Sequence, residues 1–370
     1  MITELPVSEK IDIKKLGRLF DNMSESYKLF WFQAIVDLAY AGKDVLTYDE
    51  LIDEMIASGW YMVSEYKLNL GPSDTMEKMI LLAFEKFGIK SSENKKNIIE
   101  ALKNNADLEL LKMKKTLTLN VPYRLQAPYL DNLKGKDWNR GQKDVAKLID
   151  NHNGLIYRFK EIDSLNSIIV VSDDFMEYIH ENYEIVSGWI RYKMIEYLQK
   201  RNPSVPGIIY KIDPPQARKL EHAIRYWKEV IQETEIRDIY CDVPLNGVPI
   251  SIDHFIPWSY VAHDELWNLT PTTRNINSSK SNNLPNWGKY ADKMCELQYR
   301  AISISHNNQK IEKLFNDCLD EYVNDPNIRN ILYEKKQNKN DFINHLKDII
   351  EPVYISAKNL GFNEWQVKNE

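Results

Sequence analysis

The chain has 370 residues, a length that favours two to three domains. Its composition, 43% hydrophobic and 28% charged residues, is typical of a folded globular protein. Lys and Arg number 48 against 54 Asp and Glu, and this net charge of −6 argues weakly against a protein that coats nucleic acid. Three cysteines without a C-x-x-C pair exclude a disulfide framework and an all-cysteine zinc knuckle. The N-terminus has charges where a signal peptide needs an apolar core, and the apolar stretch 29–41 is too short to cross a bilayer. We therefore expect a soluble, cytoplasmic protein without membrane contacts.

Residues 1–112 are predicted to form a helical domain. The capping box Thr47-x-x-Glu50 marks the start of one helix, and a similar Asp74-x-x-Glu77 pattern marks another. Gly59 and Gly88 follow these apolar runs and are the predicted helix ends. The predicted helices of this region cover approximately 29–41, 47–59, 74–88 and 94–103.

Residues 113–203 are predicted to form a mixed β/α region. Apolar and polar residues alternate with period two in 116–121 and in parts of 155–159 and 167–171, which indicates strands, the last two forming a hairpin. A helix follows over about 175–201. Two clusters rich in Pro and Gly, at 202–207 and 213–215, then mark the best domain boundary in the chain.

Residues 237–287 contain an unusual set of polar side chains. Asn246-Gly247 is a strong hairpin signal between predicted strands at 239–241 and 248–253. Asp253 and His254 stand at the end of the second strand, where a change of direction at Pro257 would let both act near one site.

A helix that ends at Pro285 is predicted to follow this hairpin, with Thr272 or Thr273 as its cap. Asn277 and Lys280 are three residues apart and share one face of this helix. A carboxylate and an amide oxygen suit a hard cation such as Mg²⁺, a neutral histidine can deprotonate water, and a cation can neutralise developing charge. Together these groups suit metal-assisted phosphodiester hydrolysis.

This segment resembles the ββα-metal fold of HNH endonucleases, in the variant that begins with Asp-His. It is similar to the HNH domain of RNA-guided CRISPR effector nucleases, which has a D-H-x-x-P-x-S start and an N-x-x-K-S-x-N-x-P end. The matching residues here are Asp253, His254, Pro257, Ser259, Asn277, Lys280, Ser281, Asn283 and Pro285. The resemblance covers roughly 50 of the 370 residues, and its density makes the motif specific.

The resemblance implies a role for each matching residue. Asp253 and Asn277 would be the metal ligands and His254 the general base that activates water. Asn268 would mainly brace the loop between strand and helix, and Lys280 would approach the phosphate or the departing oxygen. The products would have 5′-phosphate and 3′-hydroxyl ends.

The chain departs from many HNH proteins in two respects. Asn277 stands where others have histidine, which favours Mg²⁺ or Mn²⁺ over softer metals. The cysteine pairs that hold a structural zinc in many relatives are absent, so no structural zinc is expected and the finger must be held by packing. The predicted local core consists of Trp258, Tyr260, Trp267 and Leu269.

Each assignment has a simpler alternative. Asp253 could be a turn residue, His254 a satisfied buried histidine and Asn268 an ordinary residue at a helix end. Lys280 could be a solvated charge, and Arg274 either a phosphate contact or a surface residue. The density of surrounding matches favours catalysis for Asp253 and His254.

The predicted fold class is α+β. It comprises a helical domain (1–112), a mixed β/α region (113–203) and an HNH nuclease domain with C-terminal helices (204–370), whose ββα-metal core spans 237–287. Residues 1–112 contain 14 Lys and Arg against 19 Asp and Glu, so five of the six excess negative charges lie there. We expect this acidic third to be a regulatory or partner-protein region.

The leading hypothesis is a metal-dependent HNH endonuclease that cuts DNA. By analogy with stand-alone HNH proteins, it would serve bacterial defence against phage or foreign DNA. A homodimer is plausible because one ββα finger cuts a single strand. The alternatives are a non-catalytic or partner-activated nucleic-acid-binding module on the same scaffold, or an RNA-cleaving nuclease.

Overall fold

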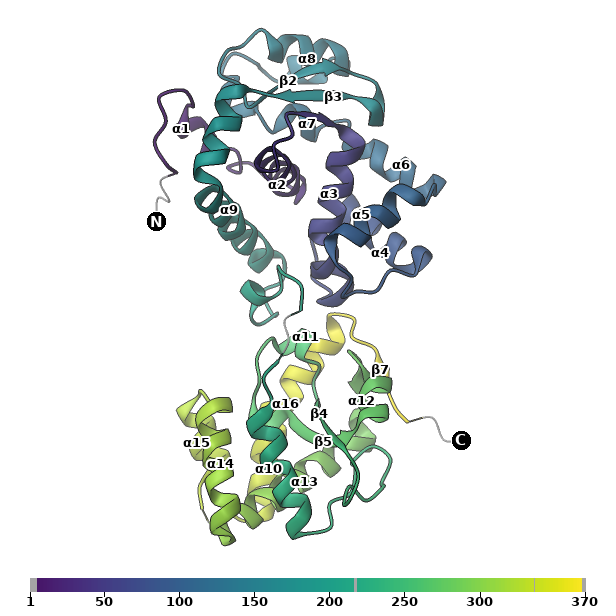
Figure 1. The fold of residues 1–370 in the computed structure, drawn as a ribbon, viewed down its shortest axis with the longest axis vertical. Helices are drawn as coiled ribbons and strands as arrows, with labels where there is room; N and C mark the ends of the chain where they lie inside the picture. Colours follow the sequence, from purple (N-terminus) through teal and green to yellow (C-terminus); the bar gives the residue numbers. More distant parts are fainter. Residues whose placement is uncertain (1–4, 216–217, 336, 368–370) are drawn as a thin grey trace. The chain divides into compact units, whose positions relative to one another are not determined.

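The computed structural model describes residues 5–215, 218–335 and 337–367. The chain divides into two compact units (Figure 1). Unit 1 comprises Met1–Pro203 with Lys211–Pro214, and unit 2 comprises Ser204–Tyr210 with Pro215–Glu370. The chain passes between the two units within residues 203–215, and the assignment of 1–112 and 113–203 as separate regions remains a prediction.

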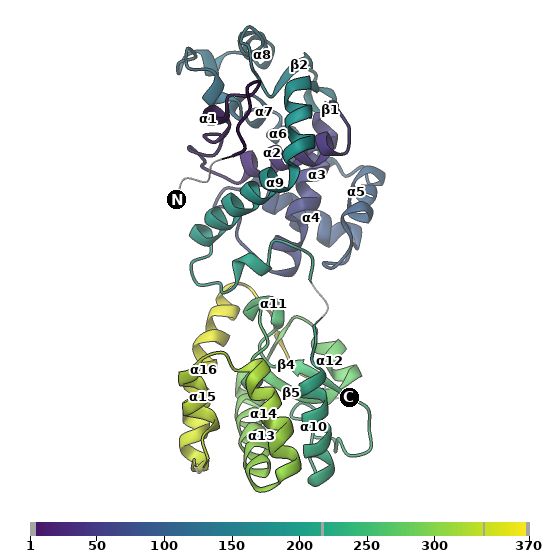
Figure 2. The same cartoon turned by 60° about the vertical axis from the view of Figure 1, so that its left-hand side comes forward.

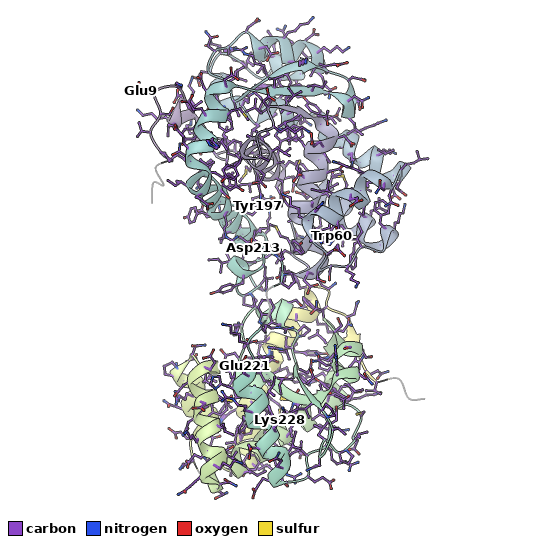
Figure 3. The ribbon with its side chains drawn as sticks, viewed as in Figure 1. Glu9, Trp60, Tyr197, Asp213, Glu221 and Lys228 are labelled. Carbon is purple, nitrogen blue, oxygen red and sulfur yellow. The ribbon has the colours of Figure 1, made fainter. Side chains whose placement is uncertain are left out.

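Unit 1 is built around a buried helix. Its helices are α1 (Ile13–Leu16), α2 (Tyr27–Tyr40), α3 (Tyr48–Trp60), α4 (Thr75–Phe87), α5 (Lys95–Asn104), α6 (Leu108–Leu117), α7 (Val121–Arg124), α8 (Gln142–Asp150) and α9 (Asp173–Arg201). Helix α2 packs against α3 and α9, and eight of its fourteen residues are buried, as its apolar run predicts. Tyr197 lies on α9 of this unit (Figure 3). Its hydroxyl donates a hydrogen bond to the Leu70 carbonyl at 2.5 Å within the same unit.

The sequence signals predict the starts of α3 and α4 and the end of α4 correctly, but not the end of α3. The side chains of Thr47 and Asp74 accept backbone N–H bonds at the first turns of α3 and α4, and Gly88 ends α4 with φ +65°. The predicted end at Gly59 is wrong, because the helix continues to Trp60 and then into a π-helical turn, Tyr61–Glu65. A Cβ at position 59 would lie 2.9 Å from Ile80 Cδ1, so this glycine permits close packing of α4.

A small antiparallel sheet in unit 1 has the order β1-β3-β2. Its strands are β1 (Val45–Thr47), β2 (Tyr157–Glu161) and β3 (Ile168–Val171), and the β2–β3 hairpin confirms the prediction. The strand predicted at 116–121 is wrong, because this segment lies at the end of α6 and the start of α7. Asp107 caps α6, and the buried residues Leu110, Leu117 and Val121 follow helical spacing rather than period two.

Unit 2 contains a strand pair and a short helix against longer helices (Figure 2). Its main elements are α10 (Glu221–Glu233), β4 (Ile250–His254), α11 (Trp258–Val261), β5 (Leu269–Thr273), α12 (Arg274–Lys280), β6 (Leu284–Pro285), α13 (Trp287–Asn307), α14 (Gln309–Tyr322), α15 (Pro326–Tyr333), α16 (Lys339–Asn359) and β7 (Glu364–Trp365). A continuous apolar core joins α10, the strand pair and α13–α16. The fold class is therefore α+β, with helices after the strand pair as predicted.

The first strand of the predicted hairpin does not form. Residues 239–241 lie in a turn, and β4 pairs instead with β5, with Asp253 opposite Thr270 and His254 opposite Leu269. Asn246-Gly247 still forms a turn, with Gly247 at φ +78°. The Asn246-Gly247 signal thus predicts the turn correctly. The strand that pairs with β4, however, is β5, about twenty residues later in the chain.

Within the described ranges, every helix is too short or too polar to cross a membrane.

Candidate active site

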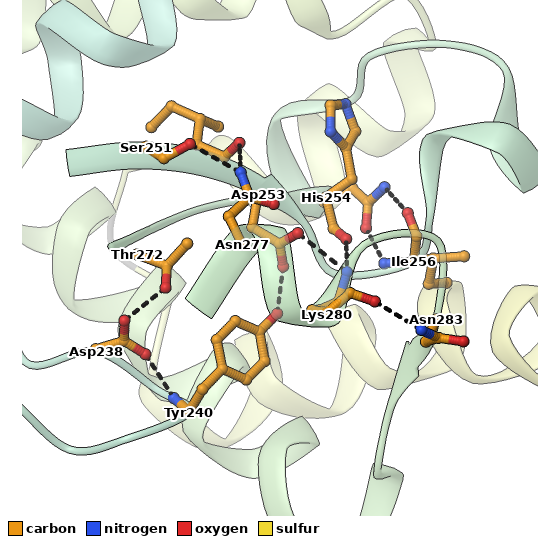
Figure 4. Close-up of polar contacts among 12 residues, drawn as sticks. Asp238, Tyr240, Ser251, Asp253, His254, Ile256, Thr272, Asn277, Lys280 and Asn283 are labelled. Carbon is orange, nitrogen blue, oxygen red and sulfur yellow. Dashed lines mark hydrogen bonds and ion pairs between the residues drawn. The ribbon is translucent and has the colours of Figure 1, made fainter. Parts of the chain in front are cut away.

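The end of β4 and one face of α12 bring the predicted site residues together (Figure 4). Thr273 ends β5 and caps α12, its Oγ1 accepting the Ile276 N–H, as predicted from the sequence. Asn277 and Lys280 therefore share one helix beside the end of β4, where Asp253 and His254 are adjacent.

Asp253 is buried and accepts two directed hydrogen bonds. Lys280 Nζ lies 3.0 Å from its Oδ1, and the Tyr240 hydroxyl donates to its Oδ2 at 2.5 Å. Burial raises the pKa of Tyr240 well above its usual value, and the adjacent Asp253 charge acts in the same direction, so Tyr240 remains a neutral donor.

Lys280 is fixed inside the site rather than solvated. Its ammonium donates to Asp253 Oδ1 and, at 2.7 Å, to the His254 carbonyl, and the residue is only 1% exposed. Burial lowers the pKa of Lys280, and the Asp253 carboxylate opposes this shift. The alternative of a solvated surface charge is wrong for Lys280, while its predicted approach to phosphate remains a prediction.

The two ring nitrogens of His254 have different partners. Nε2 lies 2.6 Å from Asp264 Oδ1, and Nδ1 lies 3.2 Å from Nη1 of Arg218. A guanidinium can only donate and a carboxylate can only accept, so these partners assign the proton to Nε2 and the lone pair to Nδ1. Burial lowers the pKa of His254 and thereby favours this neutral form, although the hydrogen bond with Asp264 acts in the opposite direction.

Asn268 directly precedes β5 and connects the start of this strand to the turn after β4. Its Oδ1 accepts the Ile256 N–H at 2.7 Å, and its Nδ2 donates to the Ile256 carbonyl at 2.9 Å. The Asn268 backbone carbonyl also accepts the Phe255 N–H, and the residue is fully buried. Both polar side-chain atoms of Asn268, Oδ1 and Nδ2, therefore hold the backbone of the turn after β4.

Asn277 is oriented by its amide nitrogen. Nδ2 donates to Ser251 Oγ at 2.8 Å and to the Ile252 carbonyl at 3.2 Å. This fixes the position of the amide and leaves Oδ1 as an acceptor, the atom that a hard cation would bind.

The donor set fits a hard divalent cation with few protein ligands. The described residues contain no group of three or more His, Cys, Asp or Glu that could hold a metal, so a protein-only cage of these types is absent there. Asp253 and Asn277 offer one carboxylate and one amide oxygen, and Mg²⁺ accepts such a pair because water and substrate phosphate can complete its octahedron. Lys280 already neutralises part of the Asp253 charge, which would weaken binding of the metal alone.

Three contributors to the site were missed by sequence reasoning. Tyr240 was assigned to a strand, and Arg218 and Asp264 were given no role in the site. Asp264 follows His254 by ten residues in an irregular loop, so no periodicity indicates their contact. The local-core prediction holds for Tyr260, Trp267 and Leu269, whereas Trp258 is partly exposed.

Asp238 connects the loop before β4 to strand β5 by side-chain hydrogen bonds. Its Oδ2 accepts from Thr272 Oγ1 at 2.5 Å, and its Oδ1 accepts the Tyr240 N–H at 2.8 Å. The loop that positions Tyr240 is thereby attached to β5. Cys241 of this loop is a free thiol.

Arg274 is the first residue of α12 and is exposed. No described hydrogen bond or ion pair connects its side chain to the other predicted site residues, so its phosphate contact remains a prediction.

Comparison with known proteins identifies the family of this segment. Residues 238–286 match the family model described as HNH endonuclease. No curated protein and no solved structure shows a significant match to the chain. The matched segment includes the loop with Asp238, the strands β4 and β5 with the loop between them, and α12. It contains Tyr240, Asp253, His254, Asp264, Asn268, Asn277 and Lys280. The chain therefore contains an HNH endonuclease domain in unit 2, which indicates nuclease activity on nucleic acid.

Proposed function

We propose that the chain is a divalent-metal-dependent endonuclease that hydrolyses phosphodiester bonds of DNA, with His254 as general base. The observation that supports it best is the arrangement of His254: a buried imidazole held by Asp264 through Nε2, with its lone pair on Nδ1, beside Asp253 and Asn277. A general base must be neutral at working pH, and the lowered pKa of His254 meets this requirement.

The chemistry assigned to the chain's residues is a single displacement at phosphorus. His254 Nδ1 accepts a proton from a water molecule as the water oxygen bonds to phosphorus. The P–O3′ bond breaks, its electron pair leaves with the 3′ oxygen, and that oxygen takes a proton from solvent, leaving 5′-phosphate and 3′-hydroxyl ends. A divalent ion held by Asp253 and Asn277 oxygens would neutralise negative charge that develops in the transition state.

Asp264 is a positioning residue in this proposal. Its carboxylate holds the imidazole by a 2.6 Å bond to Nε2 and thereby selects the tautomer with a basic Nδ1. Asp264→Asn would replace this acceptor with an amide that can also donate to Nε2 and favour the wrong tautomer. We expect kcat to fall about 10²-fold or more while KM changes little.

The acidic composition does not contradict a DNA substrate. Residues 253–370 contain 14 Lys and Arg against 16 Asp and Glu, so the nuclease region is nearly neutral. DNA binding would then depend on a few placed cations, such as Arg274, or on a partner protein that contacts the acidic residues 1–112. A role in bacterial defence and a homodimer that cuts both strands belong to the same proposal.

The test is nicking of supercoiled plasmid with Mg²⁺ or Mn²⁺. His254→Gln is expected to reduce the nicking rate by about 10²- to 10⁴-fold, the usual contribution of a general base. His222→Gln is the matched control, because His222 lies on α10 of the same unit and contacts Arg225 rather than the site. Circular dichroism of both variants checks folding.

Three outcomes would contradict the proposal or part of it. Absence of metal-dependent nicking on single- and double-stranded DNA, with or without partner proteins, would favour the non-catalytic module. Full activity of a folded His254→Gln protein would refute the assigned base. Cleavage of RNA but not DNA would show that the substrate is RNA and would leave the assigned site residues unchanged.

A further inference from the structure

Arg218 makes an unusual contact with the candidate general base. Its Nη1 lies 3.2 Å from His254 Nδ1, the nitrogen that carries the lone pair. A base can accept a proton from water only when the water lies within hydrogen-bond distance of that nitrogen. The guanidinium therefore stands where the reacting water and the scissile phosphate must meet.

The electrostatic environment of Arg218 suits an anionic ligand. The side chain is exposed, and its described contacts are a neutral imidazole nitrogen and the ring of Trp258, whose centroid lies 5.6 Å from Cζ. No carboxylate within the described ranges pairs with it, whereas Arg237 and Arg329 of the same unit have carboxylate partners. A guanidinium has five donors in a planar fork that matches two phosphate oxygens, so most of its donor capacity is unused.

Lys280, the other cation that contacts His254, is too buried to be the first group that binds an arriving phosphate. Lys280 is 1% exposed, and its ammonium is bound to Asp253 and to the His254 carbonyl. Arg218 is exposed and reaches the same histidine from the segment before α10, outside the matched residues 238–286. An exposed guanidinium can move to a new anion by side-chain rotation alone.

We propose that Arg218 binds the scissile phosphate and that its contact with His254 Nδ1 is its resting position in the substrate-free protein. A non-bridging phosphate oxygen is a stronger acceptor than a neutral imidazole, so the arriving phosphodiester draws the guanidinium away. The same movement frees Nδ1 for the reacting water. The base is thereby uncovered only when a phosphodiester is present. This inference rests on the proposed function and adds to it the phosphate-binding group.

The test compares cleavage by Arg218→Ala and Arg218→Lys with that by Arg225→Ala. Arg225 is a matched control because it is an exposed arginine of unit 2 whose Nη2 lies 3.3 Å from a histidine Nδ1, that of His222, outside the site. Loss of a group that stabilises transition-state charge is expected to lower kcat/KM by about 10²- to 10³-fold in Arg218→Ala. Arg218→Lys keeps the charge without the fork and should recover part of this loss, and Arg225→Ala should cleave at the wild-type rate.

A binding measurement separates phosphate contact from a structural effect. Fluorescence anisotropy with a short DNA duplex in EDTA should show weaker binding by Arg218→Ala and a smaller salt dependence, because one phosphate contact is lost. Binding by Arg225→Ala should be unchanged.

The two levels of the proposal can fail separately. If folded His254→Gln cleaves normally, the proposed function is wrong. If His254→Gln is inactive while Arg218→Ala cleaves at or above the wild-type rate, the proposed function stands and the phosphate-binding role of Arg218 is overturned. A rate above wild type would show that Arg218 only blocks the base.

Discussion

Among the described residues, each unit contains one nearly solvent-free Lys–Asp pair, and the two pairs differ in what surrounds them. In unit 1, Lys114 Nζ lies 2.6 Å from Asp53 Oδ1, and Asp49 supplies a second carboxylate to the same lysine. In unit 2, Lys280 Nζ lies 3.0 Å from Asp253 Oδ1, and the additional neighbours are the Tyr240 hydroxyl and the His254 carbonyl. Both units therefore contain a buried ion pair, but only the pair in unit 2 lies beside the other residues of the candidate site.

The difference lies in the hydrogen bonds of the carboxylate. Neither oxygen of Asp53 has a hydrogen bond of good geometry, and burial raises the pKa of this group to about 6 despite Lys114. Asp253 instead has a directed donor on each oxygen. The unit 2 carboxylate is held in one orientation beside His254 and Asn277, which is what its proposed role as a metal ligand requires.

Removal of each lysine is the strongest test of this comparison. Lys114→Met and Lys280→Met each leave a buried carboxylate unpaired, which typically costs about 3–5 kcal/mol of folding free energy. We expect both to lower stability in chemical denaturation, and Lys280→Met alone to abolish DNA cleavage under conditions where the protein remains folded. Equal loss of cleavage in folded Lys114→Met would contradict the assignment of a purely structural role to the unit 1 pair.

The pH dependence of unit 1 stability tests the Lys114–Asp53 pair through its carboxylate. The folded-state pKa of Asp53 is about 6, above its unfolded value, so the folded state binds the proton more tightly. Unit 1 should therefore lose stability as the pH rises from about 4 to 6, by at most about 3 kcal/mol, and show no further change from this group above that range. Asp53→Asn should remove this component from denaturation curves recorded between pH 4 and 7, and an unchanged slope would show that other groups cause it.

The smallest expected effect is that of Tyr240→Phe. This change removes the hydroxyl from Asp253 Oδ2, and a hydrogen bond to a charged group contributes about 1.5–3 kcal/mol. Because Lys280 still holds Oδ1, we expect reduced cleavage and a higher Mg²⁺ requirement rather than complete loss. A metal titration of the nicking rate measures this shift, and Tyr290→Phe, which alters an aromatic neighbour of Tyr240, is the control.

Local signals in the sequence predicted much of this site. Thr273 caps α12 and the spacing of Asn277 and Lys280 places both on it, because caps and helical periodicity depend on neighbouring residues. The roles of Tyr240, Asp264 and Arg218 depend on contacts between segments 10 to 36 residues apart, which no period encodes. The same limit explains the wrong partner for β4, since a turn signal does not specify which later strand pairs with it.

The position of α12 depends on residues made much later during synthesis. This helix has seven residues, too few to be stable in isolation, and Trp365 Nε1 donates to its Ser279 while β7 pairs with β6 directly after it. Asn277 and Lys280 would therefore reach their final positions only after residue 365 has left the ribosome. A nascent chain that lacks the segment around residue 365 would therefore lack the contacts that hold α12, and the proposed nuclease site would stay incomplete in partly made protein.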